Sequence, residues 1–306
     1  MMLQPLELGL IVAWAAAHAG IGWYVASVAR EVTYVTLADG RRQERSLPLS
    51  FKMMLPFVGN LDRVVSRPMF AKDIAEADRL LVSGGYEGLL NGREFMALRI
   101  LVPIVMGAVW SLVVVLLGEI MPDSMFVSSR TTICIFGIIL FALQPMMWLR
   151  AMVKKRHLEI MKALPFVLDV LTLSVEAGMD FISALQRNCS ARRMDALNEE
   201  LLRMTKEIQV GSSRKQALRS MAERVRQPDL KSVASALIQA DELGVSIGAI
   251  LRIQSEQLRA RRFDRAEKLA NEAPTKMLGP LMLCIFPAVF IILLGPVLTQ
   301  AMKGML

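Results

Sequence analysis

The residues best suited to covalent chemistry form a short motif, Gly244-Val-Ser-Ile-Gly248. The pattern G-x-S-x-G carries the nucleophilic serine of many hydrolases, where a histidine and an acid activate it at a sharp turn between a strand and a helix. The chain has two histidines, and one of them, His18, lies in an apolar run, where a hydrogen-bonded packing role is favoured over a proton relay. Because Ser246 stands between two predicted helices, it is better explained as a helix cap, and we predict no catalytic residue and no enzyme activity.

The sequence also lacks the residue patterns that cofactor binding and metal binding require. The run Gly211-Ser-Ser-Arg-Lys215 does not have the spacing of a phosphate-binding loop, G-x-x-x-x-G-K-[ST], so we predict no ATP site in this chain. The metal-binding spacings H-E-x-x-H and C-x-x-C are absent from the sequence. The three cysteines are far apart and odd in number, which favours small buried side chains over a disulfide framework. We therefore predict neither a cofactor nor a metal site.

Two carboxylates suggest a binding role instead. Glu176 and Glu242 each stand two residues before a glycine, in turns that belong to one repeating pattern. We predict that they form an acidic patch on which a partner protein docks. For each carboxylate taken alone, an ordinary solvated surface position is the alternative.

A repeat of 33 residues organises the second half of the chain. In each copy a glycine is followed two residues later by a helix-capping residue, and a leucine comes five residues after that: Gly178, Asp180 and Leu185; Gly211, Ser213 and Leu218; Gly244, Ser246 and Leu251. A glycine that ends one helix and a cap that begins the next predict helical hairpins.

Further breaks near residues 191–193 and 227–229 complete this pattern. Six helices in three hairpins are predicted, over residues 164–177, 180–190, 193–210, 213–226, 229–243 and 246 to about 273. The hairpins can stack as a solenoid or close into a compact bundle, and the sequence leaves both arrangements open.

The composition indicates the environment of these helices. Apolar residues make up 54% of the 306 residues, yet the chain also carries 36 Lys+Arg and 28 Asp+Glu, and its mean hydropathy is +0.43. A chain that is both this apolar and this charged must separate the two kinds of residue. This excludes an ordinary soluble domain, a disordered protein and a small disulfide scaffold. A basic surface is only one explanation of the net charge of +8, and we predict no nucleic-acid partner.

Four windows without Asp, Glu, Lys or Arg are long enough to cross a bilayer, which takes about 20 apolar residues in a helix. They cover residues 8–29, 100–118, 131–149 and 277–302. No basic residue precedes the first window, as one would in a signal peptide, so we predict a permanent anchor. Glycine-proline pairs at 279–280 and 295–296 predict that the last span is kinked.

The basic residues predict the topology. Of the 36 Lys+Arg, 11 fall in residues 30–99 and 23 in residues 150–276. The positive-inside rule therefore places both segments in the cytoplasm and both termini on the non-cytoplasmic side, which is the periplasm if the membrane is a bacterial inner membrane. Four arginines on the helix before the final span are predicted to face anionic lipid headgroups, with a solvated helix face as the alternative: Arg259, Arg261, Arg262 and Arg265.

These features divide the chain into five parts. We predict an N-terminal transmembrane helix, a partly helical cytoplasmic segment, a transmembrane hairpin, a cytoplasmic helical domain, and a C-terminal transmembrane helix with its tail. Their bounds are 1–30, 31–98, 99–150, 151–276 and 277–306. The predicted fold class is an all-α integral membrane protein with four transmembrane helices and a cytoplasmic domain of six helices.

The segment 31–98 has local signals of its own. Val32–Leu37 has the β-branched bias of a strand and is followed by a turn signal. Residues 51–83 are predicted as amphipathic helix, interrupted near Pro56 and Pro68. Asn91 and Glu94 form a cap pair that predicts the start of a helix running into the second span.

The turns and the final span resemble a known family. Four segments resemble the type II secretion F domain, which also occurs in type IV pili and in the tight-adherence (Tad, or Flp) pilus system: Leu164-Pro165, Val175-Glu-Ala-Gly178, Glu207-Ile-Gln-Val-Gly211 and Asp241-Glu-Leu-Gly244. Five segments nearer the C-terminus are similar to the TadC member of the TadB/TadC pair: Leu258-Arg-Ala-Arg-Arg262, Arg265-Ala-Glu-Lys268, Pro274-Thr-Lys-Met277, Ile285-Phe-Pro287 and Leu294-Gly-Pro296. The resemblance covers residues 160–300, nearly half of the chain.

The resemblance implies a non-enzymatic platform protein in the bacterial inner membrane, with the helical domain as its cytoplasmic F domain. The implied partners are a hexameric secretion ATPase, a second platform protein of the TadB kind and the pilin, in a homo- or hetero-oligomer. Motion of the ATPase would then move pilin between the bilayer and the fibre. An ion-conducting stator or another membrane scaffold subunit is the alternative, and an intramembrane hydrolase and a transporter permease are further rivals.

Overall fold

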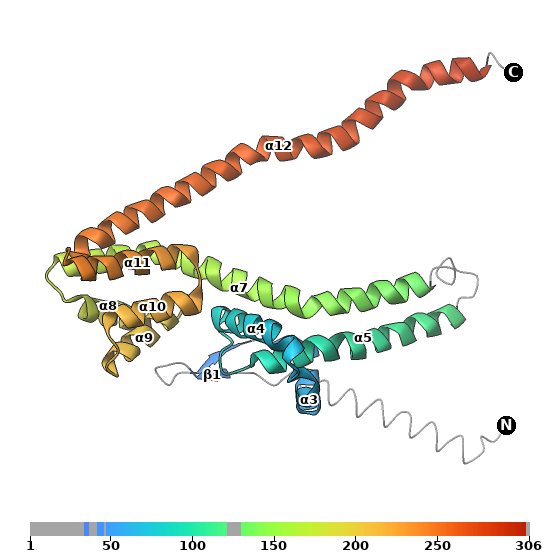
Figure 1. Cartoon of the computed structure of the whole chain (residues 1–306). Helices are drawn as coiled ribbons and strands as arrows, with labels where there is room; N and C mark the ends of the chain where they lie inside the picture. Colours follow the sequence, from blue (N-terminus) through green and yellow to red (C-terminus); the bar gives the residue numbers. More distant parts are fainter. Residues whose placement is uncertain (1–33, 37–41, 46, 121–129, 304–306) are drawn as a thin grey trace, which may run out of the picture.

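Three long helices dominate the computed structural model of the chain (Figure 1). The structure describes residues 34–36, 42–45, 47–120 and 130–303. The predicted first span, residues 8–29, lies outside the described residues, as do residues 121–129 between the second and third spans. The prediction of a periplasmic N-terminus also falls outside them.

The long helices are α5 (Gly92–Ile120), α7 (Arg130–Glu176) and α12 (Ile247–Lys303). Each contains one predicted window, and each is long and apolar enough to cross a membrane. Three of the four predicted spans therefore coincide with membrane-length helices of the described residues. Figure 1 shows α5 and α7 running side by side, while α12 leaves the rest of the molecule and extends toward the same side.

The hairpin of α5 and α7 is closed by a large residue packed on a small one. The indole ring of Trp110 covers Gly137, where a Cβ atom would lie only 2.1 Å from the indole nitrogen. The same nitrogen donates a hydrogen bond to the carbonyl of Ile133 over 3.2 Å, and Arg130 donates to the carbonyl of Val115 over 3.0 Å. A buried backbone approach of this kind requires glycine, because any side chain would displace the ring.

Two of the predicted domain boundaries fall inside continuous helices. Helix α7 has 47 residues and passes through position 150, and α12 has 57 residues and passes through position 276. The helical domain is therefore not joined to the spans by a linker, since its first and last helices continue into the membrane-length parts of α7 and α12. The prolines at 145 and 165 lie inside α7 without ending it, as proline can where neighbouring groups satisfy the freed carbonyl.

Four shorter helices complete the helical domain: α8 (Phe181–Ala191), α9 (Ala196–Gln209), α10 (Arg214–Val225) and α11 (Pro228–Leu243). Together with the C-terminal part of α7 and the N-terminal part of α12 they share one hydrophobic core. Its largest fully buried side chains include Ile160, Leu185, Leu197, Met204, Leu218, Leu230 and Leu251. The hairpins are thus closed into a compact bundle and not stacked as a solenoid.

The segment before α5 is built from short pieces. Strands β1 (Tyr34–Thr36) and β2 (Arg42–Glu44) pair antiparallel, with Tyr34 opposite Glu44. The helical pieces that follow are α2 (Leu49–Met54), η1 (Leu55–Leu61), α3 (Asp62–Val65), η2 (Pro68–Phe70) and α4 (Ala71–Gly84). The predicted strand is confirmed by β1. The predicted interruptions are confirmed as well, because Pro56 is the second residue of η1 and Pro68 is the first residue of η2.

These short pieces pack on the membrane helices and form a second core. Phe51 makes edge contacts with Phe95 of α5 and Trp148 of α7, at ring-centroid distances of 6.3 and 4.9 Å. Helix α4 contacts α5, α7 and also α10 of the helical domain. The segment thus lies in the corner between the membrane hairpin and the helical domain (Figure 1). We call it the corner segment, residues 47–91.

Candidate functional site

The three repeat glycines lie at the same end of the helical domain. Gly178, Gly211 and Gly244 have φ of +91°, +108° and +66°, and each follows the end of a helix. Left-handed backbone of this kind favours glycine, which has no Cβ atom to clash with the preceding carbonyl. Because α7, α9 and α11 run away from the spans, the three turns lie at the end of the domain opposite the membrane. We call this end the distal tip.

Two of the three predicted caps bond through their side chains. The Asp180 carboxylate accepts the backbone N–H of Ile182, and the Ser213 hydroxyl accepts that of Gln216, whose side chain bonds back to the Ser213 backbone. Ser246 directly precedes α12, and its carbonyl accepts the N–H of Ile250 over 3.3 Å. These bonds satisfy N–H groups that a helix otherwise leaves unpaired at its first turn.

The two predicted docking carboxylates lie at the distal tip, and each is paired within the domain. Glu176 at the end of α7 accepts from Arg252 of α12 over 2.7 Å. Glu242 at the end of α11 pairs with Lys215 of α10. The hydrogen bond and the charge of Lys215 lower the pKa of Glu242. Both carboxylates therefore tie adjacent turns together, whatever else they contact.

Apolar side chains at the distal tip are more exposed than these charges. Val210 is 88% exposed and Leu243 is 76% exposed, and each directly precedes a turn glycine. Val245, after the third glycine, is 45% exposed. Sequence reasoning missed these residues; the available signal was an apolar residue at the C-terminal end of a helix where the hydrophobic stripe has ended. A cluster of exposed apolar side chains is typical of an interaction surface.

At the opposite end of the domain, one buried carboxylate holds α12. Asp229 at the start of α11 is 4% exposed and accepts from Arg261 and from Arg265, each over 3.0 Å. Gln227 donates a third hydrogen bond over 3.1 Å. Burial alone would raise the pKa of Asp229, but the bonds from Arg265, Arg261 and Gln227 outweigh it, so the pKa lies below its ordinary value. We call this contact the Asp229 clamp.

The arginines predicted to face lipid are mostly engaged by the protein. Arg261 and Arg265 belong to the Asp229 clamp, and Arg259 pairs with Asp169 of α7, which also accepts a hydrogen bond from Ser255. Arg262 takes part in none of the ion pairs of the described residues. The structure thus gives three of the four arginines a role in joining α12 to the bundle, while contact with lipid stays a prediction.

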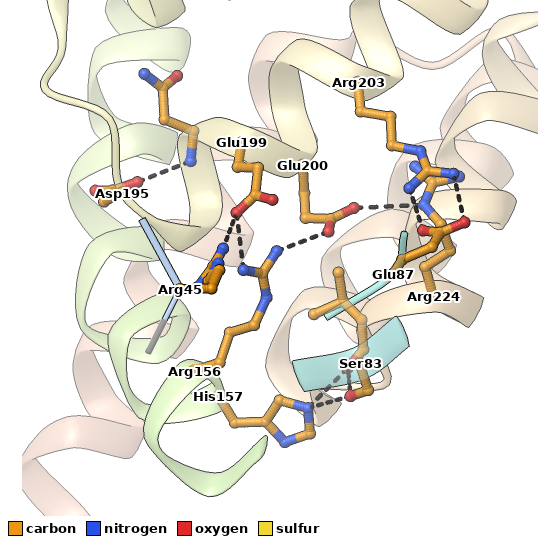
Figure 2. Close-up of polar contacts among 12 residues, drawn as sticks. Arg45, Ser83, Glu87, Arg156, His157, Asp195, Glu199, Glu200, Arg203 and Arg224 are labelled. Atoms are coloured by element: carbon orange, nitrogen blue, oxygen red, sulfur yellow. Dashed lines mark hydrogen bonds and ion pairs between the residues drawn. The ribbon is translucent and has the colours of Figure 1, made fainter. Parts of the chain in front are cut away.

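A second polar junction joins α7 to the bundle (Figure 2). Arg156, whose side chain is 3% exposed, donates to Glu199 over 2.8 Å and to Glu200 over 2.9 Å, both on α9. Arg45, beside strand β2, donates to Glu199 over 2.7 Å. Two opposed carboxylates satisfy the buried guanidinium, which would otherwise be very costly to bury. We call this contact the Arg156 junction.

The Arg156 junction continues into α10 and the corner segment. Arg224 of α10 lies 3.4 Å from Glu200 and 2.6 Å from Glu207. Arg203 of α9 pairs with Glu87 of the corner segment, and this pair lowers the pKa of Glu87. Figure 2 shows these side chains as one row between the two parts. A connected set of charges specifies one relative placement of the elements that carry it.

Beside this row, His157 joins α4 and α10. Its Nε2 atom lies 2.7 Å from the carbonyl oxygen of Val225 and 2.9 Å from the hydroxyl of Ser83, which itself donates to the same carbonyl. Burial lowers the pKa of His157, so the ring is neutral at pH 7 and donates from Nε2 to Val225. His157 therefore acts as a packing and hydrogen-bonding residue of the junction.

Among the described residues, no group of three or more His, Cys, Asp or Glu side chains is placed to hold a metal ion. Ser246 lies at a helix start at the distal tip, whereas His157 lies at the other end of the domain. Burial raises the pKa of the Cys189 thiol to about 11, which leaves it protonated and unreactive.

Comparison with known proteins agrees with this geometry. Residues 167–295 match the family of the type II secretion system (T2SS), protein F, a range that begins in α7, includes α8 to α11 and ends within α12. This range contains the distal tip and the Asp229 clamp, whereas Arg156 and the corner segment precede it. No match is found among curated proteins or among solved structures.

Proposed function

Since residues 167–295 carry the protein F domain of the type II secretion system family, we propose that the chain is an inner-membrane platform protein of a Tad/Flp-type pilus assembly machine. It couples a cytoplasmic secretion ATPase to the insertion or extraction of pilin. The observation that carries the proposal is the continuity of α7 and α12, which are each one helix from the cytoplasmic bundle into the membrane-length part. A displacement of the bundle must therefore reach the spans.

The two polar junctions support this coupling. The Arg156 junction holds α7 to α9 and α10, and the Asp229 clamp holds α12 to α11, both on the side of the bundle nearer the spans. Fixed ion pairs keep the helices in register when a force acts at the distal tip. Beyond the clamp, nearly all described side chains of α12 up to residue 294 are exposed, and the helix extends away from α7, which leaves it room to tilt (Figure 1).

The partners follow from the same arrangement. We assign the distal tip, with Val210, Leu243 and the flanking carboxylates Glu176 and Glu242, to the ATPase. The exposed apolar faces of α5, α7 and α12 suit lipid, pilin and a second, TadB-like platform protein, in a homo- or hetero-oligomer. The chain itself needs no cofactor in this role and is not an enzyme.

The docking assignment is tested by co-purification of the ATPase with the tagged protein from native membranes in mild detergent. The double variant Val210→Glu, Leu243→Glu should lose the ATPase while keeping the fold, because both side chains are already exposed. The matched control is Met69→Glu, at a residue that is 74% exposed and lies away from the distal tip. Retention of the ATPase by the double variant would remove the distal tip as its site.

The role of the carboxylates is separated from folding by a charge swap. Glu242→Lys breaks the pair with Lys215, and the double change Glu242→Lys, Lys215→Glu restores it with the opposite direction. If the ATPase recognises the carboxylate at 242, both variants fail to retain it. Recovery of the ATPase by the swap alone would show that Glu242 only supports the turn.

The alternative is an ion-conducting stator or another scaffold subunit. Mass spectrometry of the proteins that co-purify with the wild type distinguishes a platform protein from a stator or scaffold subunit. A secretion ATPase together with a second F-domain protein supports the platform role, and a peptidoglycan-binding partner in their place contradicts it.

A further inference from the structure

A groove between α10 and α11 is lined by cations that form no ion pair with a carboxylate among the described residues. It has a volume of about 760 Å³, and it lies on the surface of the helical domain. Its basic lining residues are Arg219, Arg226 and Lys231. All three are exposed, and none takes part in an ion pair of the described residues. By contrast, the other arginines of α10 and most of those on the cytoplasmic part of α12 are paired with carboxylates.

The acidic lining residues leave the groove with a positive excess. Glu242 at one end is occupied by Lys215. Glu223 is an unpaired carboxylate, and its backbone carbonyl accepts a hydrogen bond from Arg226 over 3.3 Å. Three free cations against one free carboxylate favour an anionic occupant.

The backbone conformation of Arg226 also supports a binding role for this groove. Arg226 ends α10 with φ of +57°, and among the described residues it is the one non-glycine residue with positive φ. The three other left-handed helix ends in this domain are glycines. Glycine adopts this conformation more easily, so the arginine at this position is explained by its side chain and not by its backbone.

The spacing of the cations selects the kind of anion. Arg219 and Arg226 are seven residues apart on one helix, which separates them by about 10 Å along the axis. A single phosphate is too small to reach both, whereas an extended peptide rises about 3.3 Å per residue and covers this distance in about three residues. Ser235 and Gln239 line the groove beside an apolar base of Ala222, Ala234 and Ile238. The hydroxyl and amide groups suit the backbone of such a peptide, and the base suits a small side chain.

The geometry points to a docking site for an extended acidic segment of another protein in the groove between α10 and α11. Its carboxylates, two to three residues apart, pair with Arg219, Arg226 and Lys231. The site adjoins the distal tip at Glu242 but differs from it in chemistry, because the carboxylates Glu176 and Glu242 of the tip are paired and its most exposed side chains are apolar. It does not depend on the identity of the machine that the protein serves.

The test is fluorescence anisotropy with the full-length protein in neutral detergent and a labelled peptide, Glu-Ala-Glu-Ala-Glu. We expect binding that weakens with added salt, and no binding of the matched peptide Lys-Ala-Lys-Ala-Lys. Arg226→Gly should weaken binding by about fivefold, the upper range for one exposed ion pair. This variant preserves the helix end, because glycine suits the left-handed position.

The triple variant Arg219→Gln, Arg226→Gly, Lys231→Gln should abolish binding. The control Lys206→Gln removes an exposed cation from α9 and should leave the affinity unchanged. Equal affinity of the triple variant and the wild type, or equal binding of both peptides, would overturn the site. So would a triple variant that binds the peptide normally but loses phosphatidylglycerol retained by the wild type in native mass spectrometry, because the groove would then serve a lipid surface.

Discussion

At the scale of single residues, buried charges decide how the parts of this protein are joined. Arg156 is 3% exposed and Asp229 is 4% exposed, and each is opposed by two side chains of the opposite charge. Such groups contribute less to net stability than to specificity, because burying them costs nearly as much as their attraction returns. Removal of one partner is costly, since it leaves the other charges buried without compensation.

Arg156→Leu should lower the free energy of unfolding by about 3 kcal/mol, at the low end of the range for a broken buried pair. Glu199 keeps Arg45 and Glu200 keeps Arg224, which moderates the loss. The measurement is chemical unfolding in one detergent, with Arg262→Gln as the control, because Arg262 is in none of the described ion pairs. Equal stability of the two variants would show that the Arg156 junction does not hold the bundle to α7.

The Asp229 clamp should make the placement of α12 depend on pH. The pKa of Asp229 is lower in the folded protein than in the unfolded chain, so the folded state prefers the charged form. The stabilisation is complete above the ordinary carboxyl pKa of about 4 and is lost as the pH falls through the lower, folded-state value. Asp229→Asn should remove this part of the acid dependence of unfolding. An unchanged acid profile in the variant would count against the clamp.

At the scale of elements, glycine positions control both the turns and the membrane hairpin. The turn glycines allow left-handed backbone, and Gly137 instead provides the space in which the ring of Trp110 lies. The same residue type thus serves a backbone need at the helix ends and a packing need inside a helix. Only the packing role inside a helix depends on which helix lies opposite.

A matched pair of substitutions separates these effects. Gly137→Ala should lower stability by about 1–2 kcal/mol, because the new Cβ displaces the indole ring and its bond to Ile133. Gly279→Ala in α12 should raise stability by up to about 1 kcal/mol, because nothing lies within 4 Å of its Cβ position and alanine favours helix. Unfolding of both variants in the same detergent gives the comparison. A stabilising effect at position 137 would contradict the hairpin packing.

At the scale of the whole molecule, two cores lie on the same membrane helix. One core joins α7 to the helical domain, and the other joins α7 and α5 to the corner segment. On α7, Arg156 stands between Val153 of one core and Ile160 of the other. Both parts are therefore packed on α7, whereas α12 leaves the bundle beyond its contacts with α7 and α11.

The topology predicted from the basic residues gives a test at this scale. A reporter enzyme that is active only in the periplasm should be active when it is fused after Leu306, because the C-terminus is predicted to be periplasmic. A cysteine introduced by Lys206→Cys, exposed on α9, should react with an impermeant maleimide only after the membrane is opened. The native thiol of Cys189 is buried, and Cys134 and Cys284 lie in apolar spans, so background labelling should be low. Labelling of the variant in intact cells would show that the orientation is opposite to the predicted one.

The membrane-length windows and the helix ends can be predicted from the sequence alone. Absence of charge over about 20 residues, a glycine after a helix and a cap before the next are local properties, because they depend on residues within one or two turns. The cap pair of Asn91 and Glu94 and the proline interruptions before α4 were predictable for the same reason.

Which charges form pairs depends on the packing of the helices and cannot be predicted from the sequence. Arg156 reaches Glu199 and Glu200 across 43 and 44 residues, and Asp229 reaches Arg261 and Arg265 across 32 and 36 residues. Sequence analysis therefore assigned Arg259, Arg261 and Arg265 to lipid, where packing gives them carboxylates. The exposed tip and the groove between α10 and α11 were missed likewise. Exposure and pairing depend on how helices pack, and packing is set by the shapes of side chains far apart in the sequence.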